Sequence, residues 1–197
     1  MYNRHRLPGF LLLVAACISS AALAQAPRAQ GGSLGQLDVS AGHWVYHGHF
    51  LARRGAHPSA WTWHEDCRWA DHRVFMVCSF SNDWAGRHVD SMVVDTYDPQ
   101  GHSFWHYEIF DSGRAAGKPF AARMRIEGAT RVESWTATRH GKSVHQRIVY
   151  KFASGSRVTV LFQQSSDGTH WRTTATGRGE KTDAAAGRAR TSPQPPG

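Results

Sequence analysis

The chain has 197 residues, of which 41% are hydrophobic, and a formal net charge of +8. Much of that charge lies near the two ends: residues 37–180 hold 17 Lys and Arg against 14 Asp and Glu, a net charge of +3. These basic residues are spaced singly, which argues against a nucleic-acid partner, since such proteins carry a clustered basic face. Residues 37–180 are numerous enough to form one domain with a sizeable core.

The N-terminus has the pattern of a secretory signal peptide. Residues 4–6 form a positively charged start, residues 10–16 a short apolar core, and residues 22–24 an A-x-A cleavage site. The apolar core is too short to cross a bilayer, so we expect no transmembrane segment. We therefore expect residues 1–24 to be removed and the mature protein to be periplasmic or secreted. The alternative is a lipoprotein, because the four residues ending at Cys17 resemble a lipobox.

Both ends of the mature chain are predicted to be disordered. Residues 25–36 are rich in Ala, Gln and Gly, and residues 181–197 are rich in Ala, Arg and Pro. Neither segment has enough apolar side chains to offset the entropy lost on ordering. We expect a flexible linker, a folded domain over residues 37–180, and a disordered tail.

The folded domain reads as a succession of β-strands separated by turn residues. Apolar and polar residues alternate within each run, and Gly, Asp, Pro or Ser mark the breaks. Asp98-Pro99-Gln100-Gly101 is one such turn. We expect ten strands, at 43–52, 61–69, 73–84, 86–97, 102–111, 120–126, 131–138, 144–152, 157–164 and 171–177.

Ten strands joined by short turns favour an all-β, antiparallel, up-and-down closed barrel, because closure removes exposed strand edges. A two-sheet sandwich is the alternative. Barrels of about eight or more strands have room for a small ligand. Eight Trp and nine Phe supply side chains that could line or fill such an interior.

Two cysteines remain after export, Cys67 and Cys78. They flank a tight turn, and a register centred between His72 and Arg73 places them directly opposite each other, close enough to bridge. An oxidising compartment favours a disulfide. The alternative is a pair of buried reduced thiols. Neither cysteine lies in a recognisable nucleophile motif.

The order of several short motifs resembles a known family. Gly42-His43-Trp44-Val45-Tyr46-His47-Gly48 is similar to the G-x-W-x-x-x-G start of many calycin-like barrels, and Ser166-Asp167-Gly168-Thr169-His170-Trp171 is similar to an S-x-D-G-x-x-W hairpin. With Cys67-Arg68-Trp69 between them, the chain resembles uncharacterised exported bacterial proteins of the DUF1579 type. The resemblance implies a lipocalin-like barrel with no assigned activity, so it offers no catalytic residues to carry over to this sequence.

Thirteen histidines suggest a second kind of site. Residues two apart on a strand point the same way, so imidazoles spaced in this manner can serve one metal ion. Exposed His alternating with buried aromatic residues is the simpler explanation. Haem binding through one His, known in nitrobindin-like barrels, is a further alternative without a local motif to support it. The candidate metal ligands are His43, His47 and His49 on one strand, and His102 and His106, which share a face with Glu108, on another.

We therefore expect an exported lipocalin-like barrel that binds a small apolar or amphipathic ligand. Its pocket would be walled by Trp44, Tyr46, Trp61, Trp63, Trp105, Tyr107 and Trp135. The alternatives are a filled barrel acting through its surface, a metal-binding protein, and a His-dependent hydrolase or isomerase. The enzyme would place one His and one carboxylate within hydrogen-bond reach in a cavity. We assign no catalytic residue, because the sequence has no G-x-S-x-G, P-loop, H-E-x-x-H or dinucleotide motif.

Overall fold

A computed structural model describes residues 34–52, 57–84, 86–111, 117 and 119–183. The expected signal peptide, Cys17, residues 25–33 of the linker and residues 184–197 of the tail lie outside these described residues. Within the described part of the chain, no helix is both long and apolar enough to span a membrane.

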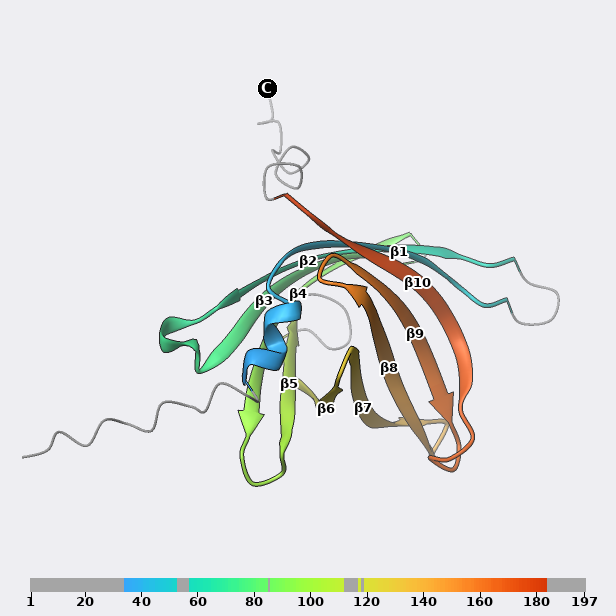
Figure 1. The fold of residues 1–197 in the computed structure, drawn as a ribbon. Helices are drawn as coiled ribbons and strands as arrows, with labels where there is room; N and C mark the ends of the chain where they lie inside the picture. The colour runs from blue at the N-terminus through green and yellow to red at the C-terminus, as the bar shows by residue number, and fades with distance from the viewer. Residues whose placement is uncertain (1–33, 53–56, 85, 112–116, 118, 184–197) are drawn as a thin grey trace, which may run out of the picture.

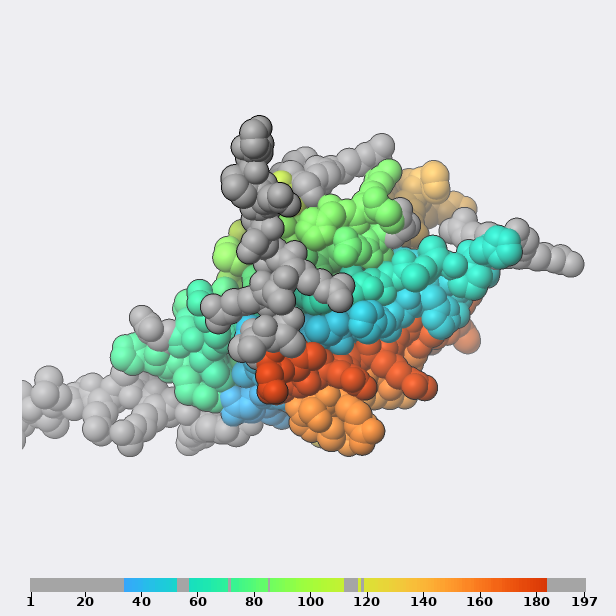
Figure 2. Space-filling model, turned by 90° about the horizontal axis from the view of Figure 1, so that it is seen from above, coloured from blue at the N-terminus to red at the C-terminus, as the bar shows by residue number. Residues whose placement is uncertain are grey.

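The expected all-β fold is confirmed: the strands form a closed antiparallel barrel in which each strand pairs with its neighbours in sequence, and β1 closes on β10 (Figure 1). Seen from above, the outer surfaces of β1, β2 and β10 lie side by side (Figure 2). The strands are β1 Gly42–Phe50, β2 Ala60–Trp69, β3 Phe75–Trp84, β4 Arg87–Asp98, β5 Ser103–Phe110, β6 Pro119–Glu127, β7 Thr130–Arg139, β8 Lys142–Ser154, β9 Arg157–Ser165 and β10 Arg172–Thr182.

The strand bounds differ from expectation by a few residues, and the structure also contains two short 3-10 helices. His102 belongs to the turn before β5, where its φ is 45°, a value outside the extended region of a strand. A 3-10 helix, η1 Leu34–Val39, begins inside the segment expected to be a flexible linker. A second short 3-10 turn, η2 Asp71–Arg73, joins β2 to β3.

The helix η1 closes one end of the barrel. Leu37 is fully buried in the core, and the indole N–H of Trp44 donates to the Ser40 carbonyl at 3.1 Å. Arg131, on the opposite wall, donates from Nη1 to Ser40 Oγ at 2.6 Å. At the rim, Asp38 accepts a hydrogen bond from the Trp69 indole at 2.8 Å. This end of the interior is therefore filled by side chains.

Two glycines let a large aromatic ring lie flat against the barrel wall. Gly48 of β1 pairs with Gly177 of β10 and with Trp61 of β2. A Cβ atom at Gly48 would lie 2.2 Å from the Trp61 ring, and one at Gly177 would lie 2.4 Å from it. The final glycine of the G-x-W-x-x-x-G motif therefore has a packing role.

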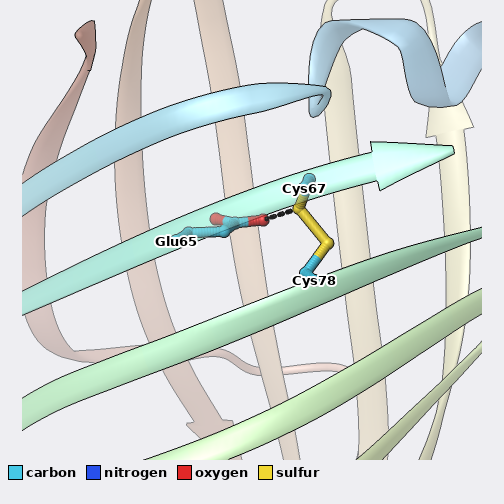
Figure 3. A group of neighbouring side chains, drawn as sticks. All are labelled: Glu65, Cys67 and Cys78. Atoms are coloured by element: carbon cyan, nitrogen blue, oxygen red, sulfur yellow. Dashed lines mark hydrogen bonds between the residues drawn. A yellow bond between two sulfur atoms is a disulfide. The ribbon is translucent and has the colours of Figure 1, made fainter. Parts of the chain in front are cut away.

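The predicted register of the first hairpin is confirmed, because Cys67 and Cys78 are directly paired. Their sulfur atoms lie at disulfide distance, 1.97 Å, inside the barrel. The Glu65 carboxyl points toward them, with Oε1 at 3.0 Å from Cys67 Sγ (Figure 3). A disulfide sulfur has no hydrogen to donate, so this approach is a contact between a carboxyl and the bridge.

We predict that reducing this bridge destabilises the fold without unfolding it. Cross-linking two residues 11 apart restricts the unfolded chain, and the loss of a bridge of this loop size costs about 2–4 kcal/mol. Urea unfolding with and without a reductant measures the change. The mass of the unreduced, denatured protein should be lower by two hydrogens, and an unchanged mass on reduction would contradict the pairing.

Candidate functional site

The end of the barrel away from η1 holds a cavity of about 780 Å³. Its lining includes residues at or near the ends of β1, β3, β5, β7 and β9, together with residues of β2, β6, β8 and β10. It therefore lies at the end opposite the buried Ser40 and Leu37. The aromatic residues that line it are Phe50, Trp61, Trp63, Phe80, Trp84, Phe110, Phe120, Trp135, Tyr150 and Phe162.

The aromatic wall is held by ring-to-ring packing, both between neighbouring strands and across the interior of the barrel. The Trp63 ring lies 5.6 Å from Phe80 and 6.0 Å from Phe162, measured between centroids. On the other side, Phe120 and Trp135 meet edge to face at 5.2 Å. The indole N–H groups of Trp61 and Trp63 are buried and have no acceptor among the described residues. The wall thus combines apolar faces with two unused donors.

Buried charged groups form the inner end of this cavity. His106, Glu108 and Glu133 line it, and His106 and Glu133 are 5% and 3% exposed. Behind them, Asp95 lies 2.8 Å from His106 Nδ1. This bond occupies Nδ1 and leaves Nε2 as the ring nitrogen that can contact a molecule in the cavity.

A second part of the cluster is centred on Arg131, which is 2% exposed. Its Nη2 atom lies 3.1 Å from Glu133 Oε1, an ion pair without the angles of a hydrogen bond. Glu133 Oε1 consequently has no hydrogen-bond partner among the described residues. The guanidinium also lies 3.9 Å from the centre of the Tyr150 ring.

The surrounding charges shift the pKa values of the buried groups. Burial acts to lower the pKa of His106, but the charges of Glu133 and Asp95 outweigh it and raise that pKa to about 9. Burial raises the pKa of Glu65 to about 7 against the opposing charge of Arg131. Burial also raises the pKa of Glu108, which accepts a hydrogen bond from Ser91 Oγ at 2.6 Å. At neutral pH His106 is a cation.

The expected aromatic pocket is only partly the observed one. Of the seven residues, Trp61, Trp63 and Trp135 line the cavity. Trp44 and Tyr46 are buried at the closed end and fill the core there. Trp105 and Tyr107 were expected in the wall, but they alternate with the inward Phe104 and His106 and so lie on the outer face, stacked on each other at 5.9 Å.

The candidate metal ligands do not converge. His47 and His49 are exposed on the outer face of β1, and His43 of the same face lies 3.4 Å from Asp66. His102 is exposed in its turn, whereas His106 is inside the barrel, so these two do not share a site. Among the described residues, one set of three potential ligands lies together, Glu65, Cys67 and Cys78. Its sulfur atoms are bonded to each other and so are not thiolates.

Sequence reasoning missed the charged residues of the cavity. Arg131 and Glu133 are two apart on β7 and share the inward face, and Asp95 takes the same face on β4. The missed signal is a pair of charges at the positions of a strand that should be apolar. Glu108 was noted beside His106, and both do line the cavity.

Comparison with known proteins supports the fold alone. No family model matches the sequence, and no curated protein matches it. Among solved structures, the chain is similar to Rv2717c from M. tuberculosis, with a TM-score of 0.50 and 9% identity over 77% of this chain and 98% of that one. It is also similar to a protein with unknown function of the DUF3598 family from Nostoc punctiforme PCC 73102, with a TM-score of 0.47 and 11% identity over 76% of this chain and 49% of that one.

We predict that His106 makes the stability of the protein depend on pH. Its folded-state pKa of about 9 exceeds the usual value of 6.5, so its contribution is complete below pH 6.5 and is lost as the pH rises through 9. This one group can change the free energy of unfolding by about 3 kcal/mol over that range.

Urea unfolding at several pH values measures the slope. His106→Gln should flatten the decline between pH 6.5 and 9, whereas His49→Gln, a change on the outer face, should leave it as in the wild type. An unaltered slope in His106→Gln would show that the pKa of this residue is not raised.

Proposed function

We propose that this chain is an exported, calycin-like barrel of the DUF1579 type that binds one small apolar or amphipathic molecule in its cavity. The observation that carries the proposal is the cavity of about 780 Å³ with an aromatic wall and a charged inner end. Ligand pockets have volumes of about 300–1,000 Å³, mostly apolar walls and a few polar groups that orient the ligand.

The division of the interior favours binding over a purely structural barrel. At the closed end, Trp44, Tyr46 and Leu37 fill the core. At the other end, rings such as Trp63 and Phe162 line space without filling it. A filled barrel would pack both ends to the density of a protein interior.

Two features support export. The first 24 residues have the three regions of a signal peptide. Cys67 and Cys78 lie at disulfide distance, and disulfides persist in oxidising compartments. A membrane anchor at Cys17 remains the alternative processing route.

One observation favours a second candidate, a His-dependent hydrolase or isomerase. His106 lines the cavity, and its Nδ1 is held by the Asp95 carboxylate at 2.8 Å. A carboxylate in this position orients an imidazole for proton transfer from its other nitrogen. Because the pKa of His106 is about 9, the ring would act as a general acid rather than a base at neutral pH.

Turnover of short-chain alkyl esters, whose leaving alcohol must take up a proton, tests the hydrolase form of this second candidate. We expect hydrolysis by the wild type and a loss of about 10²–10⁴-fold in His106→Ala, the contribution typical of a positioned acid or base. His49→Ala is the matched control on the outer face and should keep full activity. Activity that survives in His106→Ala would remove this residue from the reaction.

For the binding function, we predict that the neutral fluorophore N-phenyl-1-naphthylamine binds in the cavity and quenches tryptophan emission. Ile148→Trp places a larger side chain in the cavity lining and should weaken binding by roughly tenfold or more, since it removes space and contacts. Ile109→Trp makes the same change on the outer face of β5, where Ile109 is 41% exposed, and should bind as the wild type does. Equal loss in both variants, or no binding by the wild type, would contradict a binding cavity.

A further inference from the structure

We infer that the inner end of the cavity selects amphipathic molecules with a cationic head group, such as an alkylammonium, which binds against Glu108 and Glu133. This inference rests on the proposed ligand-binding function and adds the charge and orientation of the ligand. The head group would enter first, with its apolar chain along the aromatic wall.

The first argument is the balance of charge. Four acidic residues, Glu65, Asp95, Glu108 and Glu133, meet at the inner end with two cations, His106 and Arg131. Fully ionised, the cluster carries a net charge of −2. In a buried site of low dielectric constant such an excess must be compensated by protons or by another cation.

The second argument is the state of the two carboxyls that line the cavity. Glu133 is 3% exposed, and its Oε1 atom lies 3.1 Å from Arg131 Nη2 but has no hydrogen-bond partner among the described residues. Glu108 has the Ser91 hydroxyl as a donor, and its second carboxyl oxygen is left for the cavity. An ammonium group has three N–H donors and no acceptor, which suits two such carboxyls.

The third argument is the environment of the Glu108 carboxyl. Burial raises the pKa of Glu108; the Ser91 hydrogen bond and the charge of His106 oppose this shift, while Glu133 and Asp95 add to it. An entering ammonium would favour the ionised form of Glu108 and so act against the effect of burial. Binding of the cation should therefore lower the pKa of Glu108.

The charges at the mouth of the cavity are positive and would favour an anionic ligand, so the inference can be tested against that alternative. Three arginines line the cavity: Arg139 and Arg172 are exposed at its mouth, and Arg147 is partly buried and donates to Gln163 Oε1 at 2.7 Å. The two exposed arginines would keep the charge of an anionic ligand at the rim. Salt and water screen exposed charges, whereas the inner carboxyls are buried, and on this ground we place the selecting charge at the inner end.

Three probes with the same chain distinguish these possibilities: dodecylamine, dodecanol and dodecanoic acid. Each is titrated below its micelle concentration, at neutral pH, against protein carrying N-phenyl-1-naphthylamine. We expect dodecylamine to displace the fluorophore roughly 10–100-fold more tightly than dodecanol, the range that hydrogen bonds to a charged group provide.

Glu108→Gln should abolish the advantage of the amine and leave dodecanol within about twofold of its wild-type affinity, since the apolar contacts are unchanged. Glu127→Gln makes the same change at an exposed end of β6 and should keep the preference. Circular dichroism checks that each variant is folded. The order of the three probe affinities in the wild type already decides whether the cavity prefers a cationic head group.

The outcomes separate the two proposals. Equal affinity for amine and alcohol, tightest binding of dodecanoic acid, or a bound fluorophore that none of the probes displaces would overturn the inference while leaving ligand binding in place. No binding of the fluorophore or of any probe would instead contradict the proposed function itself.

Discussion

The buried guanidinium of Arg131 is the constraint on which the rest of the interior depends. An arginine cannot release its proton inside a protein, so the core around it must supply acceptors and negative charge. Ser40 and Glu133 do this directly, one from the end of η1 and the other from the same strand. Glu133 then faces His106, whose Nδ1 lies 3.9 Å away, and the charge network extends to Asp95. The guanidinium thus links the closing helix to the inner end of the cavity.

The number of strands explains why the interior is filled at one end and open at the other. A barrel widens with each added strand, and at about eight strands side chains just fill its interior. This barrel has ten. At the closed end, a segment from outside the sheet, with Leu37 at its centre, makes up the missing volume. At the other end, among the described residues, the aromatic rings of the wall enclose a cavity of about 780 Å³.

The sequence was sufficient to predict the strand order and the register of the hairpin between β2 and β3, but not the residues of the site. Turn residues and period-two alternation predicted ten strands, and the short turn between β2 and β3 set Cys67 opposite Cys78. β5 shows the limit: Phe104, Trp105, His106 and Tyr107 are ring-bearing residues on both faces, so hydrophobicity cannot tell which face is inside. The pairing of β5 with β4 and β6 decides it, and the stagger around the whole barrel decides which strands meet at one level. Neither is a local property of the sequence.

The chemistry of the inner end is hard to explain by stability. Apolar side chains of similar size are often at least as stabilising as a buried ion-pair network, because removing charges from water costs more than their pairing returns. Much of the closed end is packed in that way around Leu37, Trp44 and Tyr46, although Arg131 reaches into it to bind Ser40. Apolar side chains in place of Glu133 and His106 would have removed two buried charged groups that line the cavity. Charged side chains placed where the interior becomes open are therefore better understood as groups that meet a ligand than as part of the core.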